Sequence, residues 1–234
     1  MAGSKGDVRH ILAAMTCPSC AAQVPIGARF CPNCGHALHA AADERRVVTV
    51  LFADIVGFTP LSERLPSEGL VRLLNEVFSA FDSLAARHGL EKIKTIGDAY
   101  MVVGGLPQPR ADHAEAGVRM ALDMRVALSA CAARTGLSLD LRIGIHSGGV
   151  VAGVIGVHKF AYDLWGDTVN TASRMESHGM PGTIQITEAT RALLPPLFEL
   201  EARGPIEVKG KGSMQTWFVR GETAPRAASV AAAV

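Results

Sequence analysis

Two aspartates stand where paired carboxylates could bind a divalent metal ion. Asp54 follows a continuous apolar run, Val47 to Ala53, that is typical of a buried strand. Asp98 lies in a Gly97-Asp98 turn between two short predicted strands. If these elements are neighbours in one sheet, both carboxylates project from the same edge, and Mg²⁺ prefers one or two carboxylates together with phosphate oxygens. Each aspartate alone is more simply explained as a strand end or a turn residue.

The segment after Asp54 has the features of a phosphate-binding turn. It reads IVGFT and leads into a predicted helix. A glycine there lets backbone amides approach phosphate oxygens, and a helix start adds the positive end of its dipole. We therefore expect Gly57, Phe58 and Thr59 to contact the substrate.

A third group lies in the segment YDLWGDTVNTASR. Asn170 and Arg174 are four residues apart and share one face of a predicted helix. An amide and a guanidinium on that face could orient a ribose and stabilise charge on a phosphoryl group. For the pair alone, an exposed arginine beside a polar neighbour is the simpler interpretation.

Four of the five cysteines form two Cys-x-x-Cys pairs near the N-terminus, at Cys17, Cys20, Cys31 and Cys34. This spacing suits one tetrahedral Zn²⁺ ion and predicts a short ribbon over 17–38. Two disulfides are the alternative, which a cytosolic setting disfavours, and His36 or His39 could replace a cysteine. The ribbon could staple the fold or contact a protein; its local charge gives least support to a nucleic-acid contact.

The elements that position these residues mix helices with hairpins. We expect helices from Ser67, over 111–133 and over 168–177, and a strand hairpin over 91–103. Strands over 139–146 and 150–157 are separated by Ser147-Gly148-Gly149, and four more strands follow the last helix, over 183–187, 197–202, 206–209 and 215–219. This order predicts an α+β fold with helices against one sheet.

The composition predicts a soluble, cytoplasmic protein. The 234 residues carry a net charge of +1, which gives no argument for a nucleic-acid or membrane-surface partner. No apolar run approaches the roughly 20 residues that span a bilayer, and the start is too weakly apolar for a secretory signal. The expected parts are a mobile N-terminus (1–16), the ribbon (17–38), a linker (39–46), the main domain (47–220) and a disordered tail (221–234).

Five motifs resemble those of the class III adenylyl and guanylyl cyclases in order and spacing: FADIVGFT, KTIGDAYM, RIGIHSG, YDLWGDTVNTASRME and VKGKG. The resemblance covers roughly residues 45 to 220. It implies a ferredoxin-like, split βαβ catalytic domain, and the cysteine unit resembles the zinc ribbon found ahead of some bacterial cyclase domains.

The resemblance also implies roles for single residues. Asp54 and Asp98 match the aspartates that bind two Mg²⁺ or Mn²⁺ ions, with the carbonyl of Ile55 as a further ligand. Lys94 and Asp163 match the pair that reads the purine.

The remaining matches concern the ribose and the phosphates. Asn170 and Arg174 match the residues that position the ribose and stabilise the transition state. Lys209 matches the lysine that binds the triphosphate, and Lys211 takes its place if the register differs by two. Some family members carry an arginine where this chain has Gly149, which weakens the expected phosphate clamp.

The purine pair favours ATP over GTP. Adenine offers an acceptor at N1 and a donor at its 6-amino group, and a lysine donates whereas an ionised aspartate accepts. Guanine has the opposite groups, a donor at N1 and an acceptor at its 6-carbonyl. The lysine would then face an N–H and the aspartate a carbonyl, and a buried mismatch of this kind is costly. The implied reaction is attack of the ribose 3′-oxygen on the α-phosphorus of ATP, which gives 3′,5′-cyclic AMP and pyrophosphate.

The resemblance further implies a homodimer with active sites at its interface, since one domain supplies the metal aspartates and the other supplies the purine pair, the asparagine and the arginine. Two alternatives stay open: a catalytically silent nucleotide-binding module and a guanylate cyclase. The complete set of matched residues argues against the first, and the purine pair argues against the second.

Overall fold

The structure, a computed structural model, describes residues 14–25, 31–35, 46–155 and 161–223. Its helices are α1 (Phe58–Arg64), α2 (Ser67–His88), α3 (His113–Thr135), α4 (Asp167–Ser177) and α5 (Glu188–Arg191). Its strands are β1 (Ala14–Thr16), β2 (Gln23–Pro25), β3 (Arg46–Val56), β4 (Glu91–Ile96), β5 (Ala99–Gly104), β6 (Asp140–Ile155), β7 (Ala161–Trp165), β8 (Ile184–Thr187), β9 (Phe198–Val208) and β10 (Gly212–Glu222).

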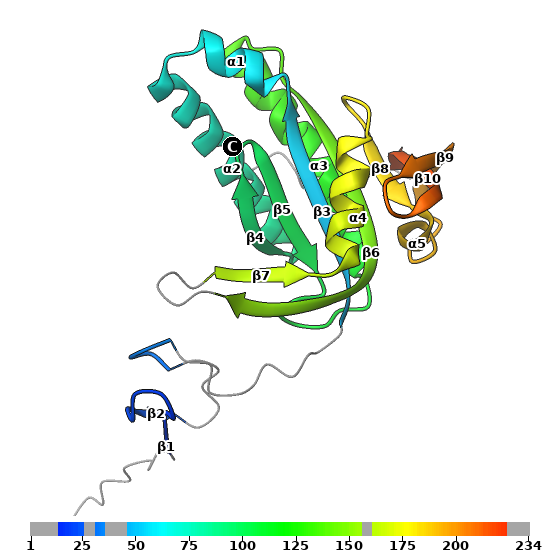
Figure 1. Ribbon diagram of the computed structural model, residues 1–234. Helices are drawn as coiled ribbons and strands as arrows, with labels where there is room; N and C mark the ends of the chain where they lie inside the picture. Colours follow the sequence, from blue (N-terminus) through cyan, green and yellow to red (C-terminus); the bar gives the residue numbers. More distant parts are fainter. Residues whose placement is uncertain (1–13, 26–30, 36–45, 156–160, 224–234) are drawn as a thin grey trace, which may run out of the picture.

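One large sheet organises the main domain (Figure 1). Its strand order is β4-β5-β3-β6-β8-β10-β9, and β7 pairs with the far half of the long strand β6. Neighbouring strands run antiparallel except β6 and β8, which are parallel. With its helices, this sheet confirms the predicted α+β fold.

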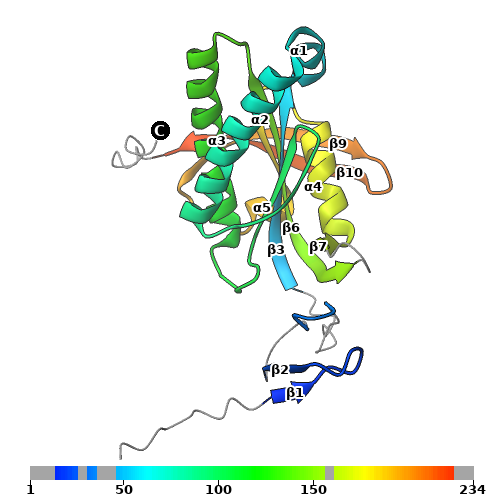
Figure 2. The same ribbon diagram turned by 90° about the vertical axis from the view of Figure 1, so that its left-hand side faces the viewer.

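Helices cover both faces of the sheet, with α2 and α3 on one side and α4 on the other (Figure 2). The strand period of two explains the division. Along β3, Leu51, Ala53 and Ile55 face the core under α2 and α3. Val48, Val50 and Phe52, and by the same alternation Asp54, face the side of α4. Asp54 therefore ends the row of residues beneath α4.

The predicted break in β6 is wrong. Gly148 and Gly149 stay within the strand and pair with Val48 and Val47 of β3. A Cβ atom on Gly148 would lie 2.6 Å from Thr168 Oγ1 of α4. This glycine therefore serves the close approach of α4 to the sheet and not a turn between two strands.

Other predicted elements agree with the structure. Helix α2 begins at Ser67, and Gly97 has a positive φ in the turn between β4 and β5. The two strands predicted over 197–202 and 206–209 form one strand, β9, and β7 is a further strand that the sequence did not indicate.

Some of the predicted parts fall outside the described residues. Residues 1–13 of the predicted N-terminal segment, residues 39–45 of the linker and residues 224–234 of the tail lie there, as do His36 and His39. Within the described ranges, β1 begins at Ala14, β3 at Arg46, and β10 extends to Glu222.

Candidate active site

Asp54 and Asp98 meet at one end of the sheet. Asp54 of β3 pairs with Ala99 of β5, and Asp98 directly precedes Ala99 in the turn from β4. Burial and, after it, the neighbouring charge of Asp98 together raise the pKa of Asp54 to about 6. Two carboxylates that repel each other in a partly desolvated place fit a divalent cation, because the cation relieves both costs.

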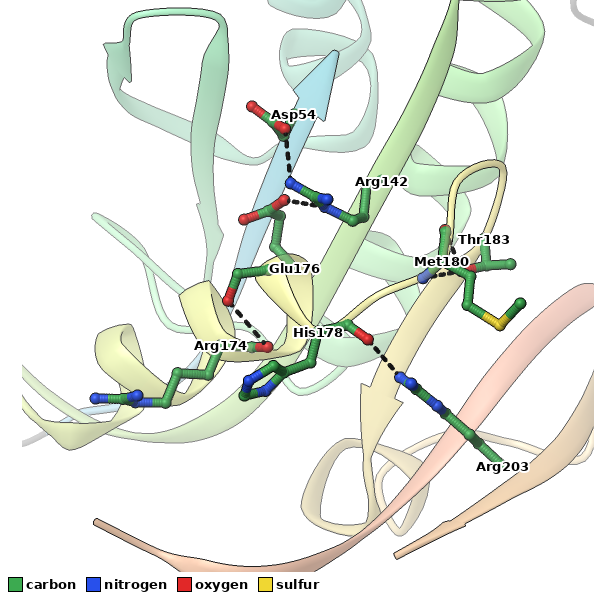
Figure 3. Close-up of polar contacts among 9 residues, drawn as sticks. Asp54, Arg142, Arg174, Glu176, His178, Met180, Thr183 and Arg203 are labelled. Carbon is green, nitrogen blue, oxygen red and sulfur yellow. Dashed lines mark hydrogen bonds and ion pairs between the residues drawn. The ribbon is translucent and has the colours of Figure 1, made fainter. Parts of the chain in front are cut away.

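A third carboxylate and an arginine complete this cluster (Figure 3). Arg142 of β6 donates from Nη2 to Asp54 Oδ2 at 3.0 Å and from Nε to Glu176 Oε1 of α4 at 2.6 Å. Sequence reasoning assigned no role to either Arg142 or Glu176. Both lie inside the cyclase-like motifs, in RIGIHSG and TASRME, but the contact between them depends on a strand register that no local pattern reveals.

Lys94 and Asp163, which are 69 residues apart in the sequence, are in contact. Lys94 Nζ on β4 donates to Asp163 Oδ2 on β7, and the other oxygen of Asp163 accepts the amide of Leu164 at 2.9 Å. A register shift between Lys92 and Lys94 in the pairing of β4 with β5 accompanies this placement. The two residues that were predicted to read the purine are therefore hydrogen-bonded to each other.

Asn170 and Arg174 lie on α4 as predicted, with Asn170 exposed and Arg174 half-buried. In Figure 3 the side chain of Arg174 points away from Asp54, although Glu176 two residues later reaches toward it through Arg142. Within one chain the side chain of Arg174, the predicted transition-state arginine, and the carboxylate of Asp54 therefore point in different directions.

The turn after β3 has the predicted geometry around Gly57. Its φ of 79° lies in the left-handed region, and α1 begins at the next residue without a side-chain cap. Phe58 and Thr59 are thus the first residues of a short helix. The side chain of Ile55 is buried in the core, so only its backbone is available to a metal ion.

The two candidate phosphate lysines differ in their contacts. Lys211 Nζ donates to Asp167 Oδ2 at the start of α4, whereas Lys209 is an exposed residue of the turn between β9 and β10. Gly149 is exposed, and a Cβ atom added there would have no neighbour within 4 Å. Its carbonyl accepts from Thr168 Oγ1 at 2.7 Å.

The four N-terminal cysteines form a compact cluster beside the β1–β2 hairpin. All four Sγ atoms lie within 4.8 Å of one another, with 3.7 Å between Cys17 and Cys34 and 3.5 Å between Cys20 and Cys31. Zinc–sulfur bonds of about 2.3 Å in a tetrahedron place the sulfurs about 3.8 Å apart. The side chain of Asn33, above other causes, lowers the pKa of Cys20 to about 6, which favours the thiolate that zinc needs. The residues fit a tetrathiolate zinc site.

Comparison with known proteins gives the family. Residues 40–221 match the model of the adenylate and guanylate cyclase catalytic domain. The chain belongs to this family. Residues 16–38 of the cyclase match a zinc-ribbon domain, which agrees with the cysteine cluster. Among the described residues, none of the helices is both long enough and apolar enough to cross a membrane.

Some relatives of the cyclase are named adenylate cyclases and others guanylate cyclases. An adenylate cyclase of Mycobacterium tuberculosis is 49% identical over 180 residues, which are 77% of this chain and 41% of the relative. The guanylate cyclase soluble subunit beta-2 of Rattus norvegicus is 48% identical over 181 residues, 76% of this chain and 26% of that protein. The chain therefore spans less than half the length of these relatives.

Solved structures share the fold of the cyclase. The guanylate cyclase domain of RhGC from Catenaria anguillulae, in complex with GTP, has a TM-score of 0.73 and 41% identity, covering 76% of this chain and 98% of that one. The adenylyl cyclase CyaB from P. aeruginosa has a TM-score of 0.75 and 32% identity, covering 78% and 97%. These similarities establish a class III cyclase fold for this chain, and structures named for either nucleotide share that fold.

Proposed function

We propose that the chain is an adenylate cyclase that converts ATP to 3′,5′-cyclic AMP and pyrophosphate. The contact between Lys94 and Asp163 carries this choice of base. Lys94 retains further N–H donors and Asp163 further lone pairs, so the joined pair can donate to N1 of adenine and accept from its 6-amino group. For guanine in the same position the lysine faces an N–H and the aspartate a carbonyl, and both contacts are repulsive.

The carboxylates of Asp54 and Asp98, together with the backbone of Ile55, are the proposed ligands of two Mg²⁺ or Mn²⁺ ions. When bound, such ions lower the pKa of the attacking 3′-hydroxyl and neutralise the leaving pyrophosphate. The chain's own residues orient the nucleotide: Asn170 holds the ribose, and Arg174 donates to the phosphoryl oxygens as their charge grows.

The phosphates take further contacts in this proposal. The turn of Gly57, Phe58 and Thr59 offers backbone amides, and Lys209 supplies a cation to the triphosphate. Lys211 is the alternative, and its contact with Asp167 connects it to the helix of Asn170 and Arg174.

We propose that two chains form a homodimer with active sites at their interface. The direction of Arg174, away from Asp54, supports this assembly, because the metal aspartates of one chain then need the arginine of another. A two-fold axis gives two equivalent sites.

One assay tests the proposed reaction. Purified chain is incubated with ATP or with GTP, each with Mg²⁺ or Mn²⁺, and the products are identified by mass spectrometry. We expect cyclic AMP as the main product. Cyclic GMP as the main product contradicts the role of the purine pair, and no cyclic nucleotide with either metal favours a silent nucleotide-binding module.

The proposed zinc site has a separate test. One Zn²⁺ bound by Cys17, Cys20, Cys31 and Cys34 should give about one zinc per chain in metal analysis. Its thiols should react with a thiol reagent only after chelation. Substoichiometric zinc with oxidised thiols contradicts the site.

We propose the cytoplasm as the location of the chain. Reduced thiolates and a nucleoside triphosphate substrate both suit that compartment.

A further inference from the structure

Arg142 and Glu176 form an ion pair that the proposed reaction does not use, and it contacts Asp54. Arg142 lies directly opposite Asp54 in the register of β6 against β3, so the sheet itself holds the two side chains side by side. The guanidinium then divides its donors, with Nη2 on Asp54 at 3.0 Å and Nε on Glu176 at 2.6 Å.

The surroundings hold this arrangement in place. Helix α4 approaches β6 so closely that a Cβ atom on Gly144 would lie 1.9 Å from the backbone nitrogen of Glu176. A Cβ atom on Gly179 would lie 2.9 Å from Cγ of Arg142, so the stem of the arginine is also confined. The side chain of Glu176 is only 12% exposed. The pair is therefore a built feature of the domain and not a loose surface contact.

The charges of this cluster have a consequence for cation binding. Asp54, Asp98 and Glu176 contribute negative charge, and Arg142 contributes the opposing positive charge. A guanidinium on Asp54 competes with a divalent cation for the same carboxylate. Glu176 offsets that positive charge and draws the guanidinium toward α4, which leaves Asp54 Oδ1 outside the ion pair with Arg142.

We propose that Arg142 is a positioning residue for the Asp54 carboxylate and that Glu176 balances its charge, so that the pair sets the affinity of the site for a divalent cation. This inference rests on the proposed role of Asp54 as a metal ligand. Because Glu176 lies on α4, the pair also links Asp54 to the helix of Asn170 and Arg174.

Substitutions of the two partners should change cation affinity in opposite directions. Glu176→Gln keeps the size of the side chain but leaves the Arg142 charge beside Asp54 without its counterion. We expect the Mn²⁺ concentration at half-saturation to rise about tenfold, which corresponds to about 1.4 kcal/mol. Arg142→Gln removes the competing charge, so Mn²⁺ should bind at least as tightly as in the wild type, while turnover falls because Asp54 loses its orientation.

Binding is measured on the full chain with Mn²⁺ alone, by the electron paramagnetic resonance signal of the free ion, so activity is not needed. The double variant Arg142→Gln with Glu176→Gln should return to within about threefold of the wild type, since both charges are gone. Arg142→Lys keeps the charge but lacks the planar fork that reaches two carboxylates, so its turnover should stay below that of the wild type. Thermal unfolding of each variant reports its folding.

Two controls separate the possible failures. Glu76→Gln removes a comparable acidic partner, that of Arg134 elsewhere on the domain, and should leave Mn²⁺ binding unchanged. Asp54→Asn should abolish Mn²⁺ binding at the site; if it does not, the proposed metal role of Asp54 is wrong. If Asp54→Asn abolishes binding while Glu176→Gln leaves the half-saturation unchanged or both single variants weaken it equally, the charge-balance inference is wrong and the pair is only a structural anchor.

Discussion

Lys94 Nζ donates to Asp163 Oδ2 and thereby joins β4 to β7, two strands that do not pair with each other in the sheet. The side chains are 41% and 22% exposed, so the pair is open to a ligand from solvent. A donor and an acceptor held together in this way present one hydrogen-bonding edge. The identity of the base depends on that edge.

Replacing the purine pair should therefore change the base preference. Lys94→Ala and Asp163→Ala should each lower kcat/KM for ATP by about 10- to 100-fold, because each removes a hydrogen bond from a charged group worth about 1.5–3 kcal/mol. Lys94→Glu combined with Asp163→Ala should shift the ratio of kcat/KM values toward GTP. Steady-state kinetics with both nucleotides checks this, and variants that lose ATP and GTP activity in equal proportion contradict base reading by this pair.

The opposed directions of Arg174 and Asp54 predict complementation between inactive variants. Asp54→Ala and Arg174→Ala should each be inactive alone, since each spoils both sites of a homodimer. When the two are mixed, a mixed dimer contains one intact site, so activity should return to about a quarter of the wild-type value after subunit exchange, given half mixed dimers with one site each. Analytical ultracentrifugation of both variants controls for dimer formation. A mixture as inactive as its parts contradicts the shared site.

Gly149 offers a test by gain of function. The position is exposed, and a new side chain there has no neighbour to displace. Gly149→Arg should lower KM for ATP by about tenfold if the guanidinium reaches the triphosphate, as one charge-assisted hydrogen bond permits. Gly149→Gln is the uncharged control and should not lower KM. An unchanged KM for the arginine variant shows that this part of β6 lies away from the phosphates.

His146 predicts an acid-sensitive step in stability. Burial, above other causes, lowers its pKa to about 4, and its Nδ1 lies 2.7 Å from Thr187 Oγ1. The unfolded chain binds the proton near the ordinary pKa of about 6.5, whereas the folded chain resists it. The free energy of unfolding is therefore unaffected by this group above pH 6.5 and falls as the pH drops from about 6.5 to about 4.

Urea unfolding at pH 7.5 and pH 5.0 measures this step. The loss between the two pH values should be smaller in His146→Gln than in the wild type, by about 1–2 kcal/mol. Glu76→Gln, which changes a carboxylate elsewhere, serves as a comparison for the acid titration of other groups. Equal losses in wild type and His146→Gln would show that the histidine is not the sensitive group.

The sequence predicted those features of the site that depend on residues close together in the chain. A buried strand ending at Asp54, a Gly97-Asp98 turn and an amphipathic helix from Ser67 each follow from spacing within a few residues. Pairing over a long sequence separation does not. The contact of Arg142 with Asp54 spans 88 residues and depends on the register of β3 against β6.

The glycines of β6 show the same limit in a different way. Gly148-Gly149 resembles a turn because two glycines lower strand propensity. In the folded domain, Gly148 lacks a side chain because Thr168 of α4 occupies that space. A packing constraint from a helix some twenty residues later in the chain thus decided the local structure, and the local sequence carried no sign of it.

The choice between ATP and GTP is tested most directly by competition. Equimolar ATP and GTP are offered together to the full chain with Mn²⁺, and the ratio of cyclic AMP to cyclic GMP is measured by mass spectrometry at low conversion. That ratio equals the ratio of the two kcat/KM values. The contact between Lys94 and Asp163 predicts an excess of cyclic AMP of at least about tenfold. Equal products, or an excess of cyclic GMP, would contradict it.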